Sequence, residues 1–400
     1  MNEIRLTTEE KQMLSGEQGR ATQKAMQILV ALGNIYQAER MIPVSSVQVA
    51  GVSYDNLGEA GLQFLAEMAE GGGKVRVPTT LNPAGMDLKN WRALGIPAEF
   101  AEKQARVIEA FTRMGINPTC TCTPYLVGNL PVYGQHLAWS ESSAVCYANA
   151  VIGALTNREG GPSALAAALT GRTPQYGLHL KEMRLPAITF KVSASLTGTR
   201  DFGALGKLIG EKIASTKSIP YIMGVSAAGL EQLKSFCASL ATYGGAALFH
   251  MPGITPEATQ YDPPANAIPI TQADIEAAIE SLNNTLPSQV DFISLGCPHL
   301  SLPEIADLAR LLDGKRVRKE FWITTARSTL QAANRLGYCR TIEAAGAKFA
   351  ADTCCVVAPI QGRFTAIATD SAKACYYASA KNKLKTVFLT IDEVVNLAVD

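Results

Sequence analysis

The cysteines are the residues of this chain that could most readily bind a metal ion or attack a substrate. Five of the nine lie in turn-like segments: Cys120 and Cys122 in Thr-Cys-Thr-Cys-Thr-Pro-Tyr, Cys297 in Gly-Cys-Pro-His, and Cys354 and Cys355 in Asp-Thr-Cys-Cys. No pair has the C-x-x-C spacing of a zinc knuckle or a ferredoxin. Three cysteines from distant loops can still meet on one iron–sulfur cluster that leaves an iron open to substrate. On local evidence alone, scattered buried thiols are the simpler interpretation.

Cys297 also allows a different chemistry. It follows a strand expected over residues 291–295 and faces a helix start capped by Ser301, with Glu304 three residues further on. A thiol near a helix N-terminus is favoured as the thiolate, which is the form that binds metal or attacks. With His299 as its base, Cys297 could be the nucleophile of a thiol-dependent enzyme.

Several other enzyme classes have no support in the sequence. The four histidines, at positions 136, 179, 250 and 299, show no H-E-x-x-H spacing, so a zinc hydrolase is disfavoured. Residues 71–74 read Gly-Gly-Gly-Lys without P-loop spacing, no G-x-G-x-x-G follows a strand, and no G-x-S-x-G occurs. A nucleotide cofactor and an α/β-hydrolase nucleophile are therefore not indicated.

Composition sets the broad class. The 400 residues are 47% hydrophobic and 18% charged, with a formal net charge of +1, which is typical of a soluble enzyme of two or three lobes. The balanced charge argues against nucleic acid as a partner. No apolar stretch reaches the roughly 20 residues that span a bilayer, and the acidic N-terminus lacks an apolar signal core. We therefore expect a cytoplasmic protein, not bound to a membrane, whose cysteines are thiols or metal ligands rather than disulfides.

The second half of the chain alternates strand and helix patterns, which predicts an α/β fold with mainly parallel sheets. Strands are expected over residues 185–194, 220–225, 246–250, 291–295, 320–324, 348–357 and 385–389, with helices between them. The first half is expected to hold helices over residues 58–70, 107–114 and 144–154 and a strand over residues 74–77. Ligands bind beyond the carboxyl ends of parallel strands, which indicates the turns after residues 250 and 295 and around residue 354.

Residues 139–174 combine an unusual density of polar side chains with many Ala and Gly residues, and further distinctive segments occur along nearly the whole chain. These segments are Gly-Val-Ser-Tyr-Asp-Asn-Leu-Gly (51–58), Pro-Thr-Thr-Leu-Asn-Pro-Ala-Gly (78–85), Cys-Thr-Pro-Tyr (122–125), His136 with Trp-Ser-Glu-Ser-Ser (139–143), Thr-Asn-Arg-Glu-Gly (156–160), Gly-Arg-Thr-Pro (171–174), Phe-His-Met-Pro-Gly (249–253), Gly-Cys-Pro-His (296–299), Asp-Thr-Cys (352–354) and Asp-Ser-Ala-Lys (370–373). In this order they resemble the large subunit of aconitase X, a branch of the aconitase superfamily.

The resemblance implies an α/β fold with an aconitase-like, multi-lobed core of mainly parallel sheets flanked by helices. It also implies a hydro-lyase with an iron–sulfur cluster held by Cys122, Cys297 and Cys354. The adjacent thiols Cys120 and Cys355 leave two of these ligand choices open. The open iron would act as a Lewis acid on the departing hydroxyl, while a base removes a proton from the neighbouring carbon.

Under this resemblance the polar segment forms part of a pocket for a small hydroxy acid. The expected substrate-binding residues are Tyr54, Asp55, Asn56, Thr80, Asn82, Ser140, Ser143, Asn157, Arg158 and Glu159, and the catalytic candidates are Glu141, Ser142, His299 and Lys373. Arg158 can bind a carboxylate through two parallel hydrogen bonds. The simpler alternatives are that Ser142 or Ser143 only caps a helix and that Glu159 only pairs with Arg158.

We expect three lobes, over residues 1–184, 185–290 and 291–400, without the swivelling domain of aconitase-like enzymes. That domain carries the catalytic serine, so the resemblance implies a separate small subunit and places the base on it. Within the family, bacterial members dehydrate cis-3-hydroxy-L-proline and archaeal members dehydrate mevalonate 5-phosphate. The Gln, Asn and Cys content is typical of a mesophile and favours the first substrate.

Overall fold

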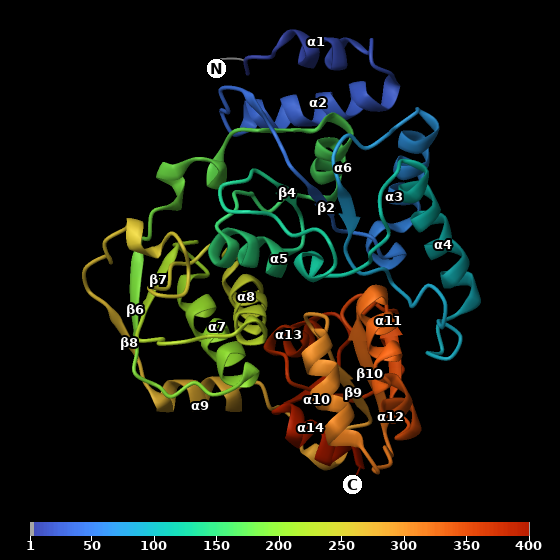
Figure 1. Ribbon diagram of the computed structural model, residues 1–400, viewed down its shortest axis with the longest axis vertical. Helices are drawn as coiled ribbons and strands as arrows, with labels where there is room; N and C mark the ends of the chain where they lie inside the picture. Colours follow the sequence, from blue (N-terminus) through green and yellow to red (C-terminus); the bar gives the residue numbers. More distant parts are fainter. Residues whose placement is uncertain (1–3, 400) are drawn as a thin grey trace.

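The computed structural model describes residues 4–399, which form three successive α/β parts (Figure 1). We name them by the predicted boundaries: the N-terminal part (4–184), the middle part (185–290) and the C-terminal part (291–399). Three of the four sheets in the described residues are wholly parallel, so the predicted fold class is confirmed. None of the described helices is long and apolar enough to span a membrane.

The N-terminal part is a small parallel sheet covered by helices. Its elements are α1 (Thr8–Ser15), α2 (Arg20–Ile35), β1 (Met41–Pro43), β2 (Val47–Val49), α3 (Tyr54–Glu70), β3 (Thr79–Leu81), α4 (Ala98–Arg113), β4 (Ala138–Trp139), α5 (Ser142–Tyr147), α6 (Gly161–Thr170) and β5 (Arg172–Pro174). The parallel sheet has the order β3-β2-β4, and β1 pairs antiparallel with β5. A π-helical turn over Ala148–Ile152 extends α5, so the predicted buried helix is present. The alanines of α6 let it lie directly on β2.

The middle part has a sheet of order β7-β6-β8. Its elements are β6 (Ile188–Val192), α7 (Thr199–Ile213), β7 (Pro220–Met223), α8 (Leu230–Gly244), β8 (Ile268–Ile270) and α9 (Gln272–Glu280). The predicted N-cap Thr271 is confirmed, because its side chain accepts from Asp274 N in a full capping box. Helices α7 and α8 pack closely: a Cβ on Gly206 would lie 2.7 Å from the Phe236 carbonyl oxygen.

The C-terminal part is a five-stranded parallel sheet between helices. Its elements are β9 (Phe292–Leu295), α10 (Leu302–Leu312), β10 (Glu320–Thr325), α11 (Arg327–Arg335), α12 (Tyr338–Ala344), β11 (Lys348–Ala351), β12 (Ala366–Thr369), α13 (Ala372–Ala380), β13 (Lys385–Phe388) and α14 (Ile391–Val399). The strand order β11-β10-β9-β12-β13 reverses direction at β9. Such a reversal opens a crevice at the carboxyl ends of the strands, where ligands bind in α/β folds.

Two predicted strands are wrong, and one is shorter than expected. Residues 74–77 form no strand, since the Val75 and Arg76 amides donate to the carbonyls of Met114 and Ala168 rather than to a strand. Residues 246–250 contribute only a single bridge, between His250 and Tyr221, beyond the edge of the middle sheet. The expected extended segment 348–357 ends at residue 351, and a turn follows it.

Gly296 sets the direction of the turn that carries Cys297. Its φ is +103°, and a Cβ at this position would lie 2.2 Å from the carbonyl oxygen of Thr324. The Thr324 hydroxyl donates to the Gly296 carbonyl at 2.6 Å. Because glycine has no side chain, the turn can lie directly against β10.

We expect Gly296→Ala to destabilise the protein more than Gly314→Ala. Both positions have positive φ, but a Cβ at Gly314 would meet no atom within 4 Å. The left-handed backbone costs each variant about 1–2 kcal/mol, and crowding against β10 adds about 1–3 kcal/mol at position 296 alone. Denaturant titration without oxygen measures the free energy of unfolding of both variants. Equal losses for the two variants would contradict the close approach to Thr324.

Candidate active site

Loops from two parts of the chain meet at the carboxyl ends of the C-terminal sheet. Cys297 follows β9, Cys354 follows β11, and Lys373 lies in the first turn of α13 after β12. The N-terminal part contributes Cys122, beyond β3, and Glu141, directly after β4. Figure 1 shows the N-terminal part lying above α11 and α13. The site therefore lies where the strand order of the C-terminal sheet predicts a crevice.

The thiols of Cys122, Cys297 and Cys354 are buried and near enough to influence one another electrostatically. Burial raises the pKa of all three, and together with Glu141 it raises the pKa of Cys122 to about 12. The Lys373 ammonium lowers each of these pKa values, but less than burial raises them. The three thiols can ionise together only if further positive charge is bound beside them, which a metal centre provides.

Backbone amides already point at two of these sulfurs. The His299 amide donates to Cys122 Sγ at 3.2 Å. The amides of Val356 and Val357 donate to the thiol of Cys354, and both bonds lower its pKa. Amide donors stabilise a thiolate more than a neutral thiol, so these loops are arranged for sulfur ligands in the ionised form.

The two neighbouring thiols differ in their surroundings. Cys120 lies beside Asp352 and Arg327, whereas Cys355 bonds with Ser294 and also lies near the thiols of Cys297 and Cys354. In the described residues, no three His, Cys, Asp or Glu side chains are placed to hold a single metal ion. Cysteines on one cluster bind different irons and need not surround a single point. The donor set therefore fits a cluster better than a single ion.

A buried ion pair joins the two sides of the site. Lys373 Nζ donates to Glu141 Oε1 at 2.5 Å, and both side chains are about nine-tenths buried. Asn82 Nδ2 donates to Glu141 Oε2 at 2.7 Å, and Ser143 Oγ donates to Oε1 at 3.0 Å. Burial disfavours the Glu141 carboxylate, but Lys373 and these hydrogen bonds outweigh burial and lower its pKa to about 2. The pair is charged at neutral pH.

Three buried polar atoms around this pair have no partner in the described residues. They are Ser140 Oγ, Asn82 Oδ1 and Thr353 Oγ1. An unpaired buried polar atom typically costs about 1–3 kcal/mol, so most such atoms in proteins are paired. Three of them beside the thiols and Lys373 indicate a place that a ligand completes.

His299 connects the loops of the three cysteines. Its Nε2 donates to the Thr353 carbonyl at 2.9 Å, and its Nδ1 lies 2.9 Å from Thr121 Oγ1. Burial lowers the pKa of His299 to about 4, so the ring is neutral and Nδ1 accepts from the threonine. Both nitrogens are occupied, and neither can take a proton from Cys297. The geometry therefore does not support the predicted thiol–imidazole pair, and it gives His299 a positioning role rather than a catalytic one.

A second buried ion pair brings the middle part to the site. Lys234 of α8 donates to the His299 carbonyl at 3.0 Å and pairs with Glu304. The sequence analysis identified Glu304 only as a capping residue and missed Lys234, because a lysine in the middle of a helix normally faces solvent.

A third group of charges also went unnoticed in the sequence. Arg327, at the start of α11, pairs with Asp87 and with Asp352, which directly follows β11. Arg327 and Asp352 both follow strand ends, so the strand-end rule could have found them.

Of the other predicted pocket residues, Ser142 lies beside the ion pair, whereas three others lie at the start of α3. Ser142 is buried in the first turn of α5, next to Glu141 and Ser143. Tyr54, Asp55 and Asn56 begin α3 and are half-buried or exposed, and Asp55 pairs with Lys381 at 2.9 Å across the two parts.

Some predicted pocket residues hold local structure instead. Thr80 Oγ1 accepts from Asn129, and Asn157 bonds the backbone of the segment 176–178. Glu159 accepts from Ser163 and Thr173, so the alternative pairing with Arg158 is not seen. Arg158 is exposed, so the structure does not place it among the buried groups around Lys373.

Comparisons with known proteins agree along the whole chain. Family models described as the aconitase X first, second and third domains match residues 3–182, 186–280 and 290–400. The phosphomevalonate dehydratase large subunit of Methanothermobacter thermautotrophicus is 45% identical, covering 99% of this chain and 98% of that protein. The cis-3-hydroxy-L-proline dehydratase of Hypocrea jecorina is 33% identical, covering 99% of this chain and 69% of that protein. The crystal structure of Thermococcus kodakaraensis aconitase X in its holo-form matches with a TM-score of 0.92 and 43% identity, over 99% of this chain and 100% of that chain.

We expect Lys373→Met to destabilise the protein by about 3–5 kcal/mol, because it leaves the Glu141 carboxylate buried without its cation. Adding Glu141→Gln removes that charge and should restore part of the loss. The free energy of unfolding, measured without oxygen on both single variants and the double variant, gives the coupling free energy between Lys373 and Glu141. Lys24→Met at the exposed Lys24–Glu67 pair is the matched control, with a change within roughly 0.5 kcal/mol. Additive losses at the buried pair would contradict the coupling.

Proposed function

Because the chain belongs to the aconitase X family, we propose that it is the large subunit of a hydro-lyase that removes water from mevalonate 5-phosphate. Relatives matched over 96–98% of their own length are named dehydratases, which are hydro-lyases. The observation that carries the proposal is the site itself: three buried thiols and the Lys373–Glu141 pair enclose polar atoms that lack partners.

We propose that Cys122, Cys297 and Cys354 hold an iron–sulfur cluster. The amides at two of the sulfurs and the nearby Lys373 ammonium favour the thiolates that such a cluster requires. When bound, the cluster supplies a Lewis-acidic iron that polarises the departing hydroxyl.

The remaining groups of the site bind and orient the substrate. Lys373 gives the buried site a positive charge suited to a carboxylate and to the negative charge that builds up on the neighbouring carbon as a proton leaves. Asn82 Oδ1 and Ser140 Oγ are free to bond substrate hydroxyl or carboxyl groups. Glu141 stays ionised at neutral pH and holds Lys373 in place, so it acts as a positioning residue and delivers no proton.

The substrate proposed here corrects the preference drawn from the sequence. Three phosphomevalonate dehydratase large subunits are 44–45% identical to this chain over 98–99% of it, whereas the hydroxyproline dehydratases are 33–34% identical. The Gln, Asn and Cys content relates to growth temperature rather than to substrate chemistry. Dehydration of mevalonate 5-phosphate is therefore the better-supported proposal, and cis-3-hydroxy-L-proline is the alternative.

We also propose a small partner subunit that carries the swivelling domain and the catalytic serine as base. The support is that relatives matched over nearly their whole length are named large subunits. No residue of this chain is assigned as the base. The cytoplasmic location stays a prediction from the sequence.

Single Cys→Ala variants test the ligand assignment. Protein purified without oxygen should lose iron and acid-labile sulfide in the variants of Cys122, Cys297 and Cys354. Cys120→Ala should keep both, since this thiol lies beside Asp352 and Arg327. Cys355→Ala should also keep both, because the Cys355 thiol is engaged by Ser294, and it tests the choice between the two adjacent thiols. Cys339→Ala, at a buried thiol in α12, controls for the loss of a buried side chain. Iron retained without any one of the three thiols would remove that residue from the ligand set.

Substrate turnover tests the proposed reaction. The chain is co-expressed with a candidate small subunit and assayed without oxygen on mevalonate 5-phosphate and on cis-3-hydroxy-L-proline. We expect water loss from the phosphorylated acid, seen as a new alkene proton signal by NMR, and at least about 100-fold lower kcat/KM on the proline. A reversed preference would establish the alternative, and activity on neither acid would contradict both.

A further inference from the structure

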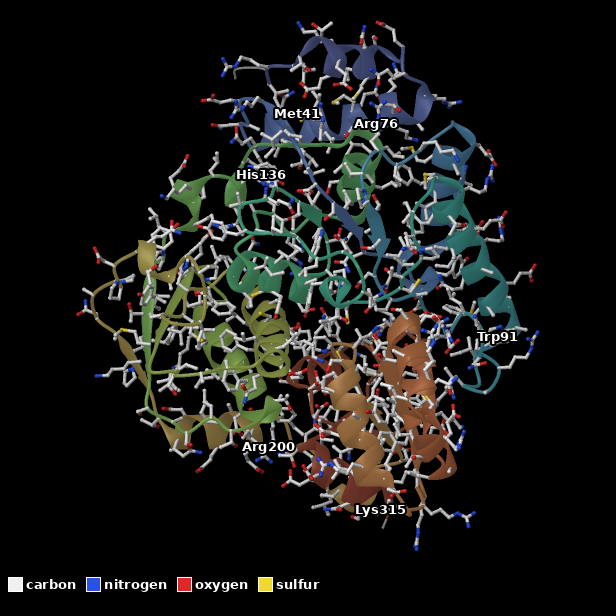
Figure 2. All side chains as sticks on the ribbon, viewed as in Figure 1. Met41, Arg76, Trp91, His136, Arg200 and Lys315 are labelled. Carbon is white, nitrogen blue, oxygen red and sulfur yellow. The ribbon has the colours of Figure 1, made fainter. Side chains whose placement is uncertain are left out.

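A second polar cavity lies between the N-terminal and middle parts, away from the cysteines. Its volume is about 280 Å³, and its lining residues include Tyr133, His136, His179, Lys181, Arg184, Glu257 and Tyr261. Figure 2 shows His136 on the side of the N-terminal part that faces the middle part. His136 precedes β4 whereas Glu141 follows it, so the cavity lies at the opposite end of this strand from the candidate active site. His136 belongs to the same distinctive segment as Ser140 and Glu141, but the proposed reaction does not use it.

Two histidines in this cavity share a proton. His136 Nδ1 and His179 Nδ1 lie 3.0 Å apart, so one donates to the other when both rings are neutral. The pair then presents one N–H and one lone pair through its two Nε2 atoms. His179 is only 4% exposed, and its Nε2 has no partner in the described residues. A buried, unpaired ring nitrogen beside a cavity indicates a missing ligand.

The charges around the pair favour an anion. The charged and titratable groups that face it are Arg40, Lys181, Arg184, Glu257, Tyr133 and Tyr261. The one carboxylate among them, Glu257, is already neutralised by Arg184, whose Nε donates to it at 2.9 Å. Lys181 is exposed and has no ion pair in the described residues. Burial, followed by Arg184 and Arg40, lowers the pKa of His136, and burial lowers the pKa of His179 to about 3, so both rings are neutral at neutral pH.

We propose that this cavity is a second ligand site, which binds a small oxyanion of the phosphate type through His179 Nε2, His136 Nε2 and Lys181. One oxygen of the anion accepts from the outward Nε2–H, and a P–OH group of a protonated phosphate donates to the other Nε2. Inorganic phosphate keeps a P–OH group throughout the neutral pH range, whereas a phosphate monoester loses its P–OH group as the pH rises through that range, so affinity for the ester rises as the pH falls. The volume also accommodates the carbon chain of a small phosphate monoester, so either inorganic phosphate or such an ester can occupy it.

Calorimetry on the oxygen-free complex tests the site, with inorganic phosphate and glycerol 3-phosphate as probes. We expect glycerol 3-phosphate to bind more tightly at pH 6 than at pH 8, because its monoanion keeps a P–OH group, and the affinity for inorganic phosphate to change less over this range. Lys181→Ala and His179→Gln should each weaken binding at least about tenfold, as expected for a lost charged hydrogen bond. Lys315→Ala, at an exposed lysine of the C-terminal part, is the matched control and should bind as the unaltered protein does.

Variants separate this site from the candidate active site. Ser140→Ala, at the cysteine site, should leave binding to the histidine cavity unchanged. Binding that is lost in Ser140→Ala but kept in Lys181→Ala would overturn the second site and leave the proposed reaction untouched. Absence of phosphate binding would also overturn it. Lys181 is exposed, so its substitution tests the proposal even if His179→Gln fails to fold. Tighter binding of the ester than of phosphate would identify an organic phosphate as the ligand.

Discussion

The buried ion pair between Glu141 and Lys373 is the interaction on which the arrangement of this protein depends. Its partners are 232 residues apart and belong to different parts of the chain. Removing two charges from water costs several kcal/mol for each ion, and only close contact with further hydrogen bonds recovers this. Asn82 and Ser143 supply those bonds from the N-terminal part. The N-terminal and C-terminal parts must therefore meet in one orientation, and the same orientation brings Cys122 to Cys297 and Cys354.

The other charged contacts between the parts repeat this design around the same point. Arg327 ties Asp87 of the N-terminal part to Asp352, and Lys234 ties the middle part to the His299 carbonyl. Polar groups this dense are tolerable only when the surrounding apolar packing is tight. This explains the many Ala and Gly residues of 139–174, because small side chains let α5 lie buried beside the site and let α6 lie directly on β2.

The end of β9 could be predicted, and with it the position of Cys297, because alternating strand and helix patterns are local. Cys354 fell inside the segment expected to be extended over 348–357, whereas β11 ends at residue 351. The partners across the site could not be predicted. Glu141 and Glu159 are both buried acids in the same polar segment, yet one pairs with a lysine 232 residues away and the other with a serine four residues away. The strands Val47–Val49 and Ala366–Thr369 were not predicted, because apolar runs this short also occur in loops. The strand expected over 74–77 failed because its amides find carbonyls elsewhere.

The histidines show why residue type alone does not assign function. His299 lies near Cys297, and the sequence suggests a catalytic role for it. Both of its ring nitrogens are bonded, however, and they connect its own loop to those of Thr121 and Thr353. His179 stands in no known motif, yet one of its ring nitrogens is buried without a partner. A fully bonded buried imidazole is complete and stabilises the fold, whereas a partly bonded one carries a cost that the fold alone does not recover. His250 also has one buried ring nitrogen without a partner among the described residues, but it does not line the cavity, so an unpaired nitrogen indicates a ligand site only where space for a ligand adjoins it.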